Sequence, residues 1–269
     1  GAAAARRAVR LLSLDCTGTL FEWSAPIGEL YSRAAARALG PKHHVPEGAA
    51  VMAAFLPAFK EGLARWPNFG YGQLSSRDFW SKVARATFQA CDCSWASDGK
   101  LFDQAFDEIY RTFQTLDAYR VFDDVLPFFR WAARQGYIVT CVSNTTESYR
   151  DHILPATGVS PMIHFGIFSK VEGKEKPGAA FDLLLERGRG LLPDLEPGQI
   201  LHIGDHRRKD AEGAAAHGFH AALLDRSRSP PREGPHGAGE RDPQDILIVT
   251  SLSDVRCRLE ASGGLWTAE

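Results

Sequence analysis

Apolar residues follow two different rhythms along this chain, and each rhythm predicts a different kind of structure. Residues 9–14 form a short, continuous apolar run that ends at Asp15, which is typical of a buried strand followed by a turn. From residue 24 to residue 115 apolar side chains recur every three or four positions, and no strand pattern interrupts them between residues 21 and 119. We therefore expect one strand followed by a long run of helices.

Four helices are predicted in this run, at residues 24–40, 47–66, 75–90 and 98–116. Ser24 before Pro26 is typical of a helix start, and a Gly-Pro pair ends the first helix. We expect Pro57 to bend or split the second helix. Ser75 with Asp78 resembles a capping box and predicts the start of the third.

Strands and helices alternate in the rest of the chain. Strands are predicted at residues 137–142, 164–168, 199–203, 220–224 and 246–249, and helices at residues 123–135, 146–156, 177–187, 209–217 and 254–261. Repeated strand–helix units predict a parallel sheet covered on both faces. The sequence thus predicts an α/β fold with a doubly wound parallel sheet and an all-helical insertion, with residues 8–23 and 120–269 in the core and residues 24–119 in the insertion.

Composition and charge exclude several classes of protein. The 269 residues hold 31 Lys and Arg against 33 Asp and Glu, so we predict no direct nucleic-acid partner, which would need a strong basic excess. A hydrophobic fraction of 44% is that of a globular protein, and no apolar run approaches the roughly 18 residues that a membrane span needs. The five cysteines show no paired spacing, which predicts no disulfide framework and suits a reducing compartment.

Two segments depart from this average composition. The first ten residues carry three arginines and no acid, which suits a trimmed organelle transit sequence as well as a simple boundary. We therefore expect an intracellular protein, in the cytoplasm or the mitochondrial matrix. Residues 226–244 are rich in Pro, Gly and Arg. We expect this excursion to be a flexible loop, and it is a candidate segment for binding a protein partner.

Polar residues directly follow the predicted strands, beginning with Asp15. Thr17 and Gly18 continue the turn after it, so Asp15 is either an exposed nucleophile or a carboxylate that caps its own loop. Ser143 and Asn144 follow the strand at residues 137–142, where a hydroxyl and an amide can hydrogen-bond an oxyanion. The first two strand ends therefore carry candidate chemistry.

Two later segments add charge to the same pattern. Lys176 opens a helix, where a lysine can neutralise a carboxylate–phosphoryl adduct. Asp205 follows the strand at residues 199–203 and Asp210 comes five residues later, so that two carboxylates can hold a divalent cation such as Mg²⁺. Each segment alone also fits a helix cap, a surface lysine or a turn. Because all of them fall in order after strands of one sheet, together they predict a functional site.

These four motifs resemble the haloacid dehalogenase superfamily. The matching segments are D-C-T-G-T-L at residues 15–20, V-S-N at 142–144, K-P at 176–177 and G-D-x-x-x-x-D at 204–210. The resemblance covers the chain except its first residues and residues 226–244, and it implies a Rossmann-like core with a helical cap. Two cap segments, residues 67–70 and 76–80, are similar to the branch called haloacid dehalogenase-like hydrolase domain-containing protein three.

The resemblance implies a hydrolase that acts on a small phosphorylated metabolite. Asp15 would attack phosphorus and form an aspartyl-phosphate. Ser143 and Lys176 would bind the phosphoryl oxygens. The backbone amides near residues 16–18, which include Thr17 and Gly18, would complete the substrate site together with Asn144.

A magnesium ion is the cofactor that the resemblance implies. Its ligands would be the carboxylates of Asp15 and Asp205 and the backbone carbonyl of Thr17. Asp210 would hold the metal or its water molecules.

One residue departs from the phosphatases of this superfamily. They carry a second Asp two residues after the nucleophile as general acid and base, and this chain has Thr17 there. General acid–base help is worth about 10²–10⁴-fold, so we expect weak turnover. The alternative is a catalytically impaired domain that binds protein partners as an accessory subunit of a larger assembly. A dehalogenase, which needs neither the acid nor a metal, ranks third.

Overall fold

A parallel sheet organises the larger part of the molecule. The computed structural model describes residues 8–227 and 246–266, so the arginine-rich start and most of the predicted excursion at residues 226–244 lie outside it. Within the described part, six strands pair in the order β5-β4-β1-β6-β7-β8, every neighbour parallel. They are β1 (Leu11–Leu14), β4 (Ile138–Ser143), β5 (Phe165–Phe168), β6 (Ile200–Gly204), β7 (His220–Leu224) and β8 (Leu247–Val249).

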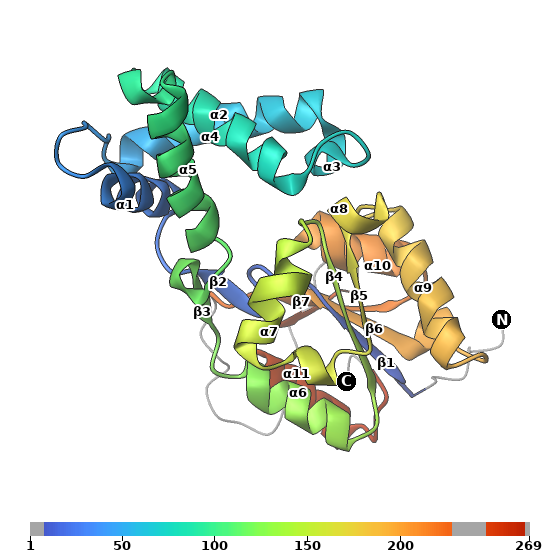
Figure 1. Ribbon diagram of the computed structural model, residues 1–269. Helices are drawn as coiled ribbons and strands as arrows, with labels where there is room; N and C mark the ends of the chain where they lie inside the picture. Colours follow the sequence, from blue (N-terminus) through green and yellow to red (C-terminus); the bar gives the residue numbers. More distant parts are fainter. Residues whose placement is uncertain (1–7, 228–245, 267–269) are drawn as a thin grey trace.

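Two apolar layers cover this sheet because successive side chains of a strand point to opposite faces. Leu12 and Leu14 of β1 belong to one buried cluster, which includes residues of α6 (Val125–Arg134) and α11 (Leu252–Ala261). Leu11 faces the other way, into a cluster with α9 (Ala179–Leu191). Figure 1 shows these helices on the two sides of the strands. The predicted doubly wound α/β fold is confirmed.

Five helices inserted after the first strands form a second apolar cluster, which we call the cap. They are α1 (Ile27–Leu39), α2 (Gly48–Arg65), α3 (Pro67–Gly70), α4 (Ser76–Ala90) and α5 (Gly99–Thr112). Phe79 and Phe102 are fully buried in this cluster, which is separate from those of the sheet. Pro57 neither splits nor ends α2, which continues through it to Arg65. In Figure 1 the cap stands beyond the end of the sheet that carries α8 (Ser169–Glu172).

A small antiparallel ladder joins the cap to the core. It pairs β2 (Phe21–Trp23) with β3 (Tyr119–Val121), and Trp23 lies opposite Tyr119. The prediction of no strand between residues 21 and 119 is therefore wrong at its first three residues. Three residues are too few for an alternating pattern, and their partner strand lies on the far side of the cap in the sequence.

Direct hydrogen bonds also connect cap and core. The Asn68 side chain in α3 donates to the Ser169 carbonyl in α8 at 2.7 Å, and Lys170 Nζ donates to the Leu74 carbonyl at 2.6 Å. Neither short helix was predicted, because four residues carry no periodicity. The predicted helices at residues 146–156 and 209–217 exist, but each begins with a π-helical turn before α7 (Leu154–Thr157) and α10 (Gly213–Ala216).

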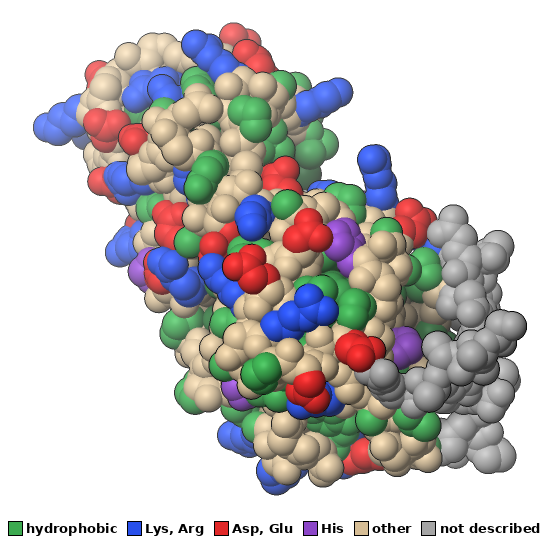
Figure 2. All heavy atoms as spheres, turned by 90° about the vertical axis from the view of Figure 1, so that its right-hand side faces the viewer, with side chains coloured by type: hydrophobic (Ala, Val, Ile, Leu, Met, Phe, Trp, Pro, Cys, Tyr) green, Lys and Arg blue, Asp and Glu red, His purple; other side chains and the backbone are tan. Residues whose placement is uncertain are grey.

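Charged side chains of both signs are mixed over the face shown in Figure 2, on the cap and on the core. On this face the charges are not separated into one acidic and one basic region. None of the helices in the described ranges is both long and apolar enough to cross a membrane.

Candidate active site

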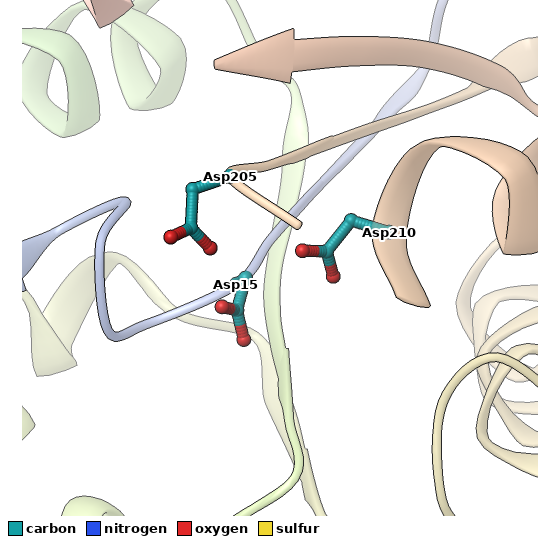
Figure 3. A group of neighbouring side chains, drawn as sticks. All are labelled: Asp15, Asp205 and Asp210. Atoms are coloured by element: carbon teal, nitrogen blue, oxygen red, sulfur yellow. The ribbon is translucent and has the colours of Figure 1, made fainter. Parts of the chain in front are cut away.

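Three carboxylates meet beyond the carboxyl ends of two central strands. Asp15 directly follows β1, while Asp205 and Asp210 follow β6, its neighbour in the sheet. One carboxylate oxygen from each side chain lies within 4.8 Å of the others, and Figure 3 shows them gathered around one space. Asp15 and Asp210 are buried, whereas Asp205 is exposed. The fold thus brings together three of the residues singled out in the sequence.

Lys176 supplies positive charge to this acidic cluster. Its Nζ donates to Asp15 Oδ1 at 2.7 Å and to Asp210 Oδ1 at 2.5 Å, and the residue is only 4% exposed. Burial alone would lower the pKa of this ammonium group, but the two carboxylates raise it above its ordinary value. Lys176 is therefore charged at neutral pH and locks the two buried aspartates in place.

Both carboxylate oxygens of Asp210 are already engaged by neighbouring groups. Besides Lys176, its Oδ1 lies 3.1 Å from His202 Nε2, and its Oδ2 accepts a hydrogen bond from the His206 backbone. Burial works to raise the pKa of Asp210, but Lys176 and His202 outweigh it and hold that pKa below its usual range. Burial lowers the pKa of His202, whose Nδ1 lies 2.8 Å from the Ser13 hydroxyl. His202 is fully buried in β6 and helps to orient Asp210.

Asp205 forms no comparable ion pair with any cation in residues 8–227 and 246–266. Partial burial and the charges of Asp15 and Asp210 raise its pKa to about 6. Two glycines let the carboxylates approach, since a Cβ on Gly18 would lie 2.0 Å from Asp205 Oδ2 and one on Gly204 would lie 2.3 Å from Asp210 Cγ. An oxygen-only donor set with excess negative charge, crowded into a space kept open by glycine, fits a hard divalent cation such as Mg²⁺.

Asp205→Asn is expected to stabilise the metal-free protein at pH 8. The folded-state pKa of about 6 lies above the ordinary 3.8, so ionisation of Asp205 opposes folding, and stability is lost as pH rises through this window. In EDTA, Tm should rise by about 1–3 °C at pH 8, because an exposed carboxylate feels only modest repulsion. At about pH 3.5 both forms are uncharged and the gain should vanish. An equal gain at both pH values would contradict this explanation.

Asn144 and Ser143 lie at the carboxyl end of β4, beside the cluster. Asn144 Oδ1 accepts a hydrogen bond from the Lys176 backbone N–H at 2.8 Å, and its Nδ2 donates to the Lys176 carbonyl at 2.9 Å. Asn144, predicted to bind substrate, thus fixes the backbone of the lysine. Ser143 is the last residue of β4 and is buried, and its hydroxyl forms no hydrogen bond with the described residues.

The side chain of Thr17, which stands where phosphatases of the superfamily carry their general acid, is engaged in a hydrogen bond. Its hydroxyl lies 2.7 Å from the hydroxyl of Tyr149, a buried residue in the π-helical turn Tyr149–Ile153. Burial raises the pKa of Tyr149 far above its ordinary value. No sequence motif marks Tyr149, because it lies 132 residues from Thr17 and only the fold joins them.

A cavity of about 220 Å³ lies between the cap and the core and reaches Thr17 and Asn144. Among the aromatic residues of the cap, Phe69 and Trp80 line it. Phe79 is fully buried in the cap cluster, and Tyr71 is exposed. The cap aromatics therefore divide between a pocket and ordinary packing.

Comparison with known proteins places this geometry among hydrolases. Residues 9–218 match the family model of haloacid dehalogenase-like hydrolases. The chain is 28% identical over 220 residues to the haloacid dehalogenase-like hydrolase domain-containing protein 3 of Bos taurus, an alignment that covers 81% of this chain and 83% of that protein.

Solved structures share the fold at lower identity. The 2-haloacid dehalogenase of Pseudomonas syringae pv. Tomato DC3000 superposes with a TM-score of 0.63 at 19% identity, covering 94% of this chain and 99% of that one. The magnesium-bound HAD-hydrolase YfnB of Bacillus subtilis gives a TM-score of 0.62 at 16% identity, covering 94% and 100%. Similarity at this level concerns the fold alone.

Proposed function

Because this chain belongs to the haloacid dehalogenase-like hydrolases, we propose that it is a phosphohydrolase that forms an aspartyl-phosphate on Asp15. Its substrate would be a small phosphorylated metabolite and its cofactor Mg²⁺. The observation that carries the proposal is the buried Lys176 ammonium, shared between Asp15 and Asp210 beside a third carboxylate. A hydrophobic core gains nothing from such a cluster, whereas phosphoryl transfer needs charge arranged in this way.

Asp15 is held in a position suited to a nucleophile. Lys176 fixes its Oδ1, while its Oδ2 accepts no hydrogen bond within the described part of the chain. Oδ2 is therefore the oxygen that would attack phosphorus. The same ammonium group would neutralise negative charge on the phosphoryl oxygens.

Donors for the phosphoryl oxygens surround this carboxylate. The backbone N–H groups of Cys16 and Thr17 donate to no acceptor among the described residues, whereas that of Gly18 is already bonded to the Phe21 carbonyl. The hydroxyl of Ser143, which is buried at the end of β4, would be a further donor. Preorganised donors of this kind stabilise charge as it develops in a transition state.

Asp15 and Asp205 would be the principal carboxylate ligands of a magnesium ion, with the Thr17 carbonyl between them in sequence. When bound, the ion supplies positive charge that offsets the phosphoryl oxygens and the excess of carboxylates. Asp210, whose oxygens already bind Lys176, His202 and the His206 backbone, would chiefly orient the site.

The proposal includes a limit on the leaving group. Thr17 cannot give a proton near neutral pH, and the pKa of the neighbouring Tyr149 is raised by burial, so it is no better as an acid. Substrates whose leaving group departs without protonation should therefore react fastest.

The alternative is an impaired hydrolase domain that serves as an accessory subunit in a larger assembly, with the mitochondrial matrix as one candidate compartment. It is favoured by one observation, the hydrogen bond that joins Thr17 to Tyr149 where phosphatases of the family carry an acid. The same protein would then bind partners and hydrolyse nothing.

A hydrolysis assay tests the proposal against this alternative. Acetyl phosphate should be hydrolysed with Mg²⁺ and not with EDTA, and in ¹⁸O-labelled water the label should enter inorganic phosphate, because water attacks phosphorus. Label in the Asp15 carboxylate would instead indicate attack on carbon, as expected for an ester intermediate of a dehalogenase. No hydrolysis above a heat-inactivated sample would favour the accessory subunit.

Thr17→Asp is expected to raise kcat on an alkyl phosphate such as glycerol 2-phosphate at least about tenfold. A carboxyl group there can protonate the leaving alcohol and later activate water, and the Tyr149 hydroxyl, now paired with Thr17, can donate to it. The matched control is Thr17→Asn, which has the same shape but cannot ionise. Equal rates for the two variants would show that the site is blocked for another reason.

A further inference from the structure

We propose that the substrate is an aryl phosphate, a phosphate monoester whose leaving group is an uncharged aromatic ring held in the cavity between cap and core. This inference rests on the proposed function and names the substrate class of the same site. Two independent features carry it, the composition of the cavity wall and the absence of an acid at Thr17.

The cavity wall is mostly aromatic, and its other polar side chains carry no charge: Thr17, Gln114, Asn144, Thr145, Thr146 and Ser148. Its cap side includes Tyr31, Phe55, Phe59, Phe69, Trp80 and Phe113. None of the described residues that line it is Lys, Arg, His, Asp or Glu. A sugar or nucleotide would lose hydration here without gaining ion pairs or enough hydrogen bonds, whereas a ring can make edge-to-face contacts.

The size of the cavity suits one or two fused rings. Its volume is about 220 Å³, and an apolar protein cavity of about 150 Å³ binds benzene. Several neighbouring rings of the wall already meet at right angles or stack, such as Phe59 on Trp80 with ring centres 5.5 Å apart. A planar guest can extend this aromatic packing.

The polar end of the cavity contains two residues that are connected to the carboxylate cluster, although the three carboxylates themselves do not line the cavity. Thr17 and Asn144 lie in its wall, Thr17 two residues after Asp15 and Asn144 bonded to the Lys176 backbone. A substrate with its phosphate at Asp15 would therefore extend its leaving group past Thr17 into the aromatic space. Cap and core together would select that group.

The chemistry of the leaving group agrees with the shape of the cavity. An Asp15 oxygen would bond to phosphorus while the bond from phosphorus to the aryl oxygen breaks, and that oxygen would leave with the electron pair as phenolate. A phenol has a pKa near 10, so phenolate departs without an acid and takes its proton from water. A water molecule would then attack phosphorus and break the bond to Asp15. Of its two protons, one stays on the inorganic phosphate and the other replaces the proton that the phenolate took from water.

Steady-state kinetics with Mg²⁺ test the proposal on the full chain. We expect kcat/KM for 1-naphthyl phosphate to exceed that for glycerol 2-phosphate at least about 100-fold. Trp80→Ala should lower the ratio of kcat/KM for 1-naphthyl phosphate to that for acetyl phosphate at least about tenfold, because acetyl phosphate has no ring to lose contacts. The matched control is Trp66→Ala, a cap tryptophan that does not line the cavity and should preserve the ratio.

Inhibition of the unmodified chain gives a second measurement that does not depend on the folding of a variant. Benzylphosphonate should inhibit acetyl phosphate hydrolysis at least about 10-fold more tightly than methylphosphonate. Equal inhibition, or an unchanged ratio in Trp80→Ala, would overturn the aryl assignment.

The choice of substrates also distinguishes failure of the aryl assignment from failure of the proposed phosphohydrolase function. Hydrolysis of acetyl phosphate without any preference for the naphthyl ester would overturn the aryl assignment alone, whereas no hydrolysis of either would overturn both. A phosphotyrosyl peptide tests whether the aromatic ring of the substrate belongs to a small molecule or to a polypeptide. We expect it to react more slowly than 1-naphthyl phosphate, and an equal rate would support aryl chemistry with the ring carried on a polypeptide.

Discussion

Asp15→Asn lowers kcat for acetyl phosphate at least about 10³-fold if Asp15 is the nucleophile, because an amide oxygen cannot form the phosphoryl intermediate. The fold should survive the change. Asparagine has nearly the shape of aspartate, and its Oδ1 can still accept the hydrogen bond that Lys176 now gives to Asp15 Oδ1 at 2.7 Å. Lys176 would also keep its ion pair with Asp210.

The measurement is a progress curve with Mg²⁺ beside a thermal melt of the same sample. Asp194→Asn is the matched control, since Asp194 is an exposed carboxylate paired with Arg10 outside the carboxylate cluster. That variant should keep the full rate. Comparable rates for Asp15→Asn and the unmodified chain, with both folded, would mean that phosphate release does not pass through Asp15.

The sequence predicted the members of the carboxylate cluster because each follows a buried strand. In a parallel sheet the carboxyl ends of neighbouring strands lie at one edge, so Asp15 after β1 and Asp205 after β6 had to lie close together. Lys176 required more than this rule, since it lies eight residues beyond β5 and reaches Asp15 only through the fold of the intervening turn.

The environment of Thr17 could not be predicted in the same way. Tyr149 lies on a helix whose sequence gives no reason to single out one tyrosine, and its contact with Thr17 depends on how that helix packs beyond β4. Spacing likewise identified the cap helices but not which aromatic side chains leave space between them. Phe79 and Trp80 are adjacent in α4, yet Phe79 is fully buried in the cap cluster and Trp80 lines the cavity.

Lys176→Met is expected to lower both stability and activity, and the two effects can be separated. Removing the lysine leaves Asp15 and Asp210 buried without a cation, which typically costs about 3–5 kcal/mol. For a chain of this size that corresponds to a fall in Tm of roughly 10 °C. Activity should fall at least about 100-fold in the surviving folded fraction, because the phosphoryl oxygens lose their ammonium partner.

The pH dependence of this loss follows from the directions of the pKa shifts. In the unmodified chain Asp210 has a lowered pKa and Lys176 a raised one, so their pair stabilises the fold throughout the range from about pH 5 to about pH 9. It weakens only as pH falls through the lowered pKa of Asp210 or rises through the raised pKa of Lys176. Without Lys176, the burial that works to raise the pKa of Asp210 is opposed less strongly, so Lys176→Met should lose less stability at pH 5 than at pH 8.

A double variant distinguishes the structural role of the lysine from its chemical role. In Lys176→Met with Asp210→Asn one of the two carboxylates left without a cation is removed, so about half of the lost Tm should return, while Asp15 stays buried and unpaired. Activity should not return, since Asp15 still lacks the ammonium group that lies 2.7 Å from it in the unmodified chain. Recovery of activity together with Tm would show that Lys176 acts only by holding the fold. Recovery of Tm without activity would assign the ammonium to the reaction only if Asp210→Asn alone, the matched control, retains more activity than the double variant, because Asp210 also belongs to the carboxylate cluster.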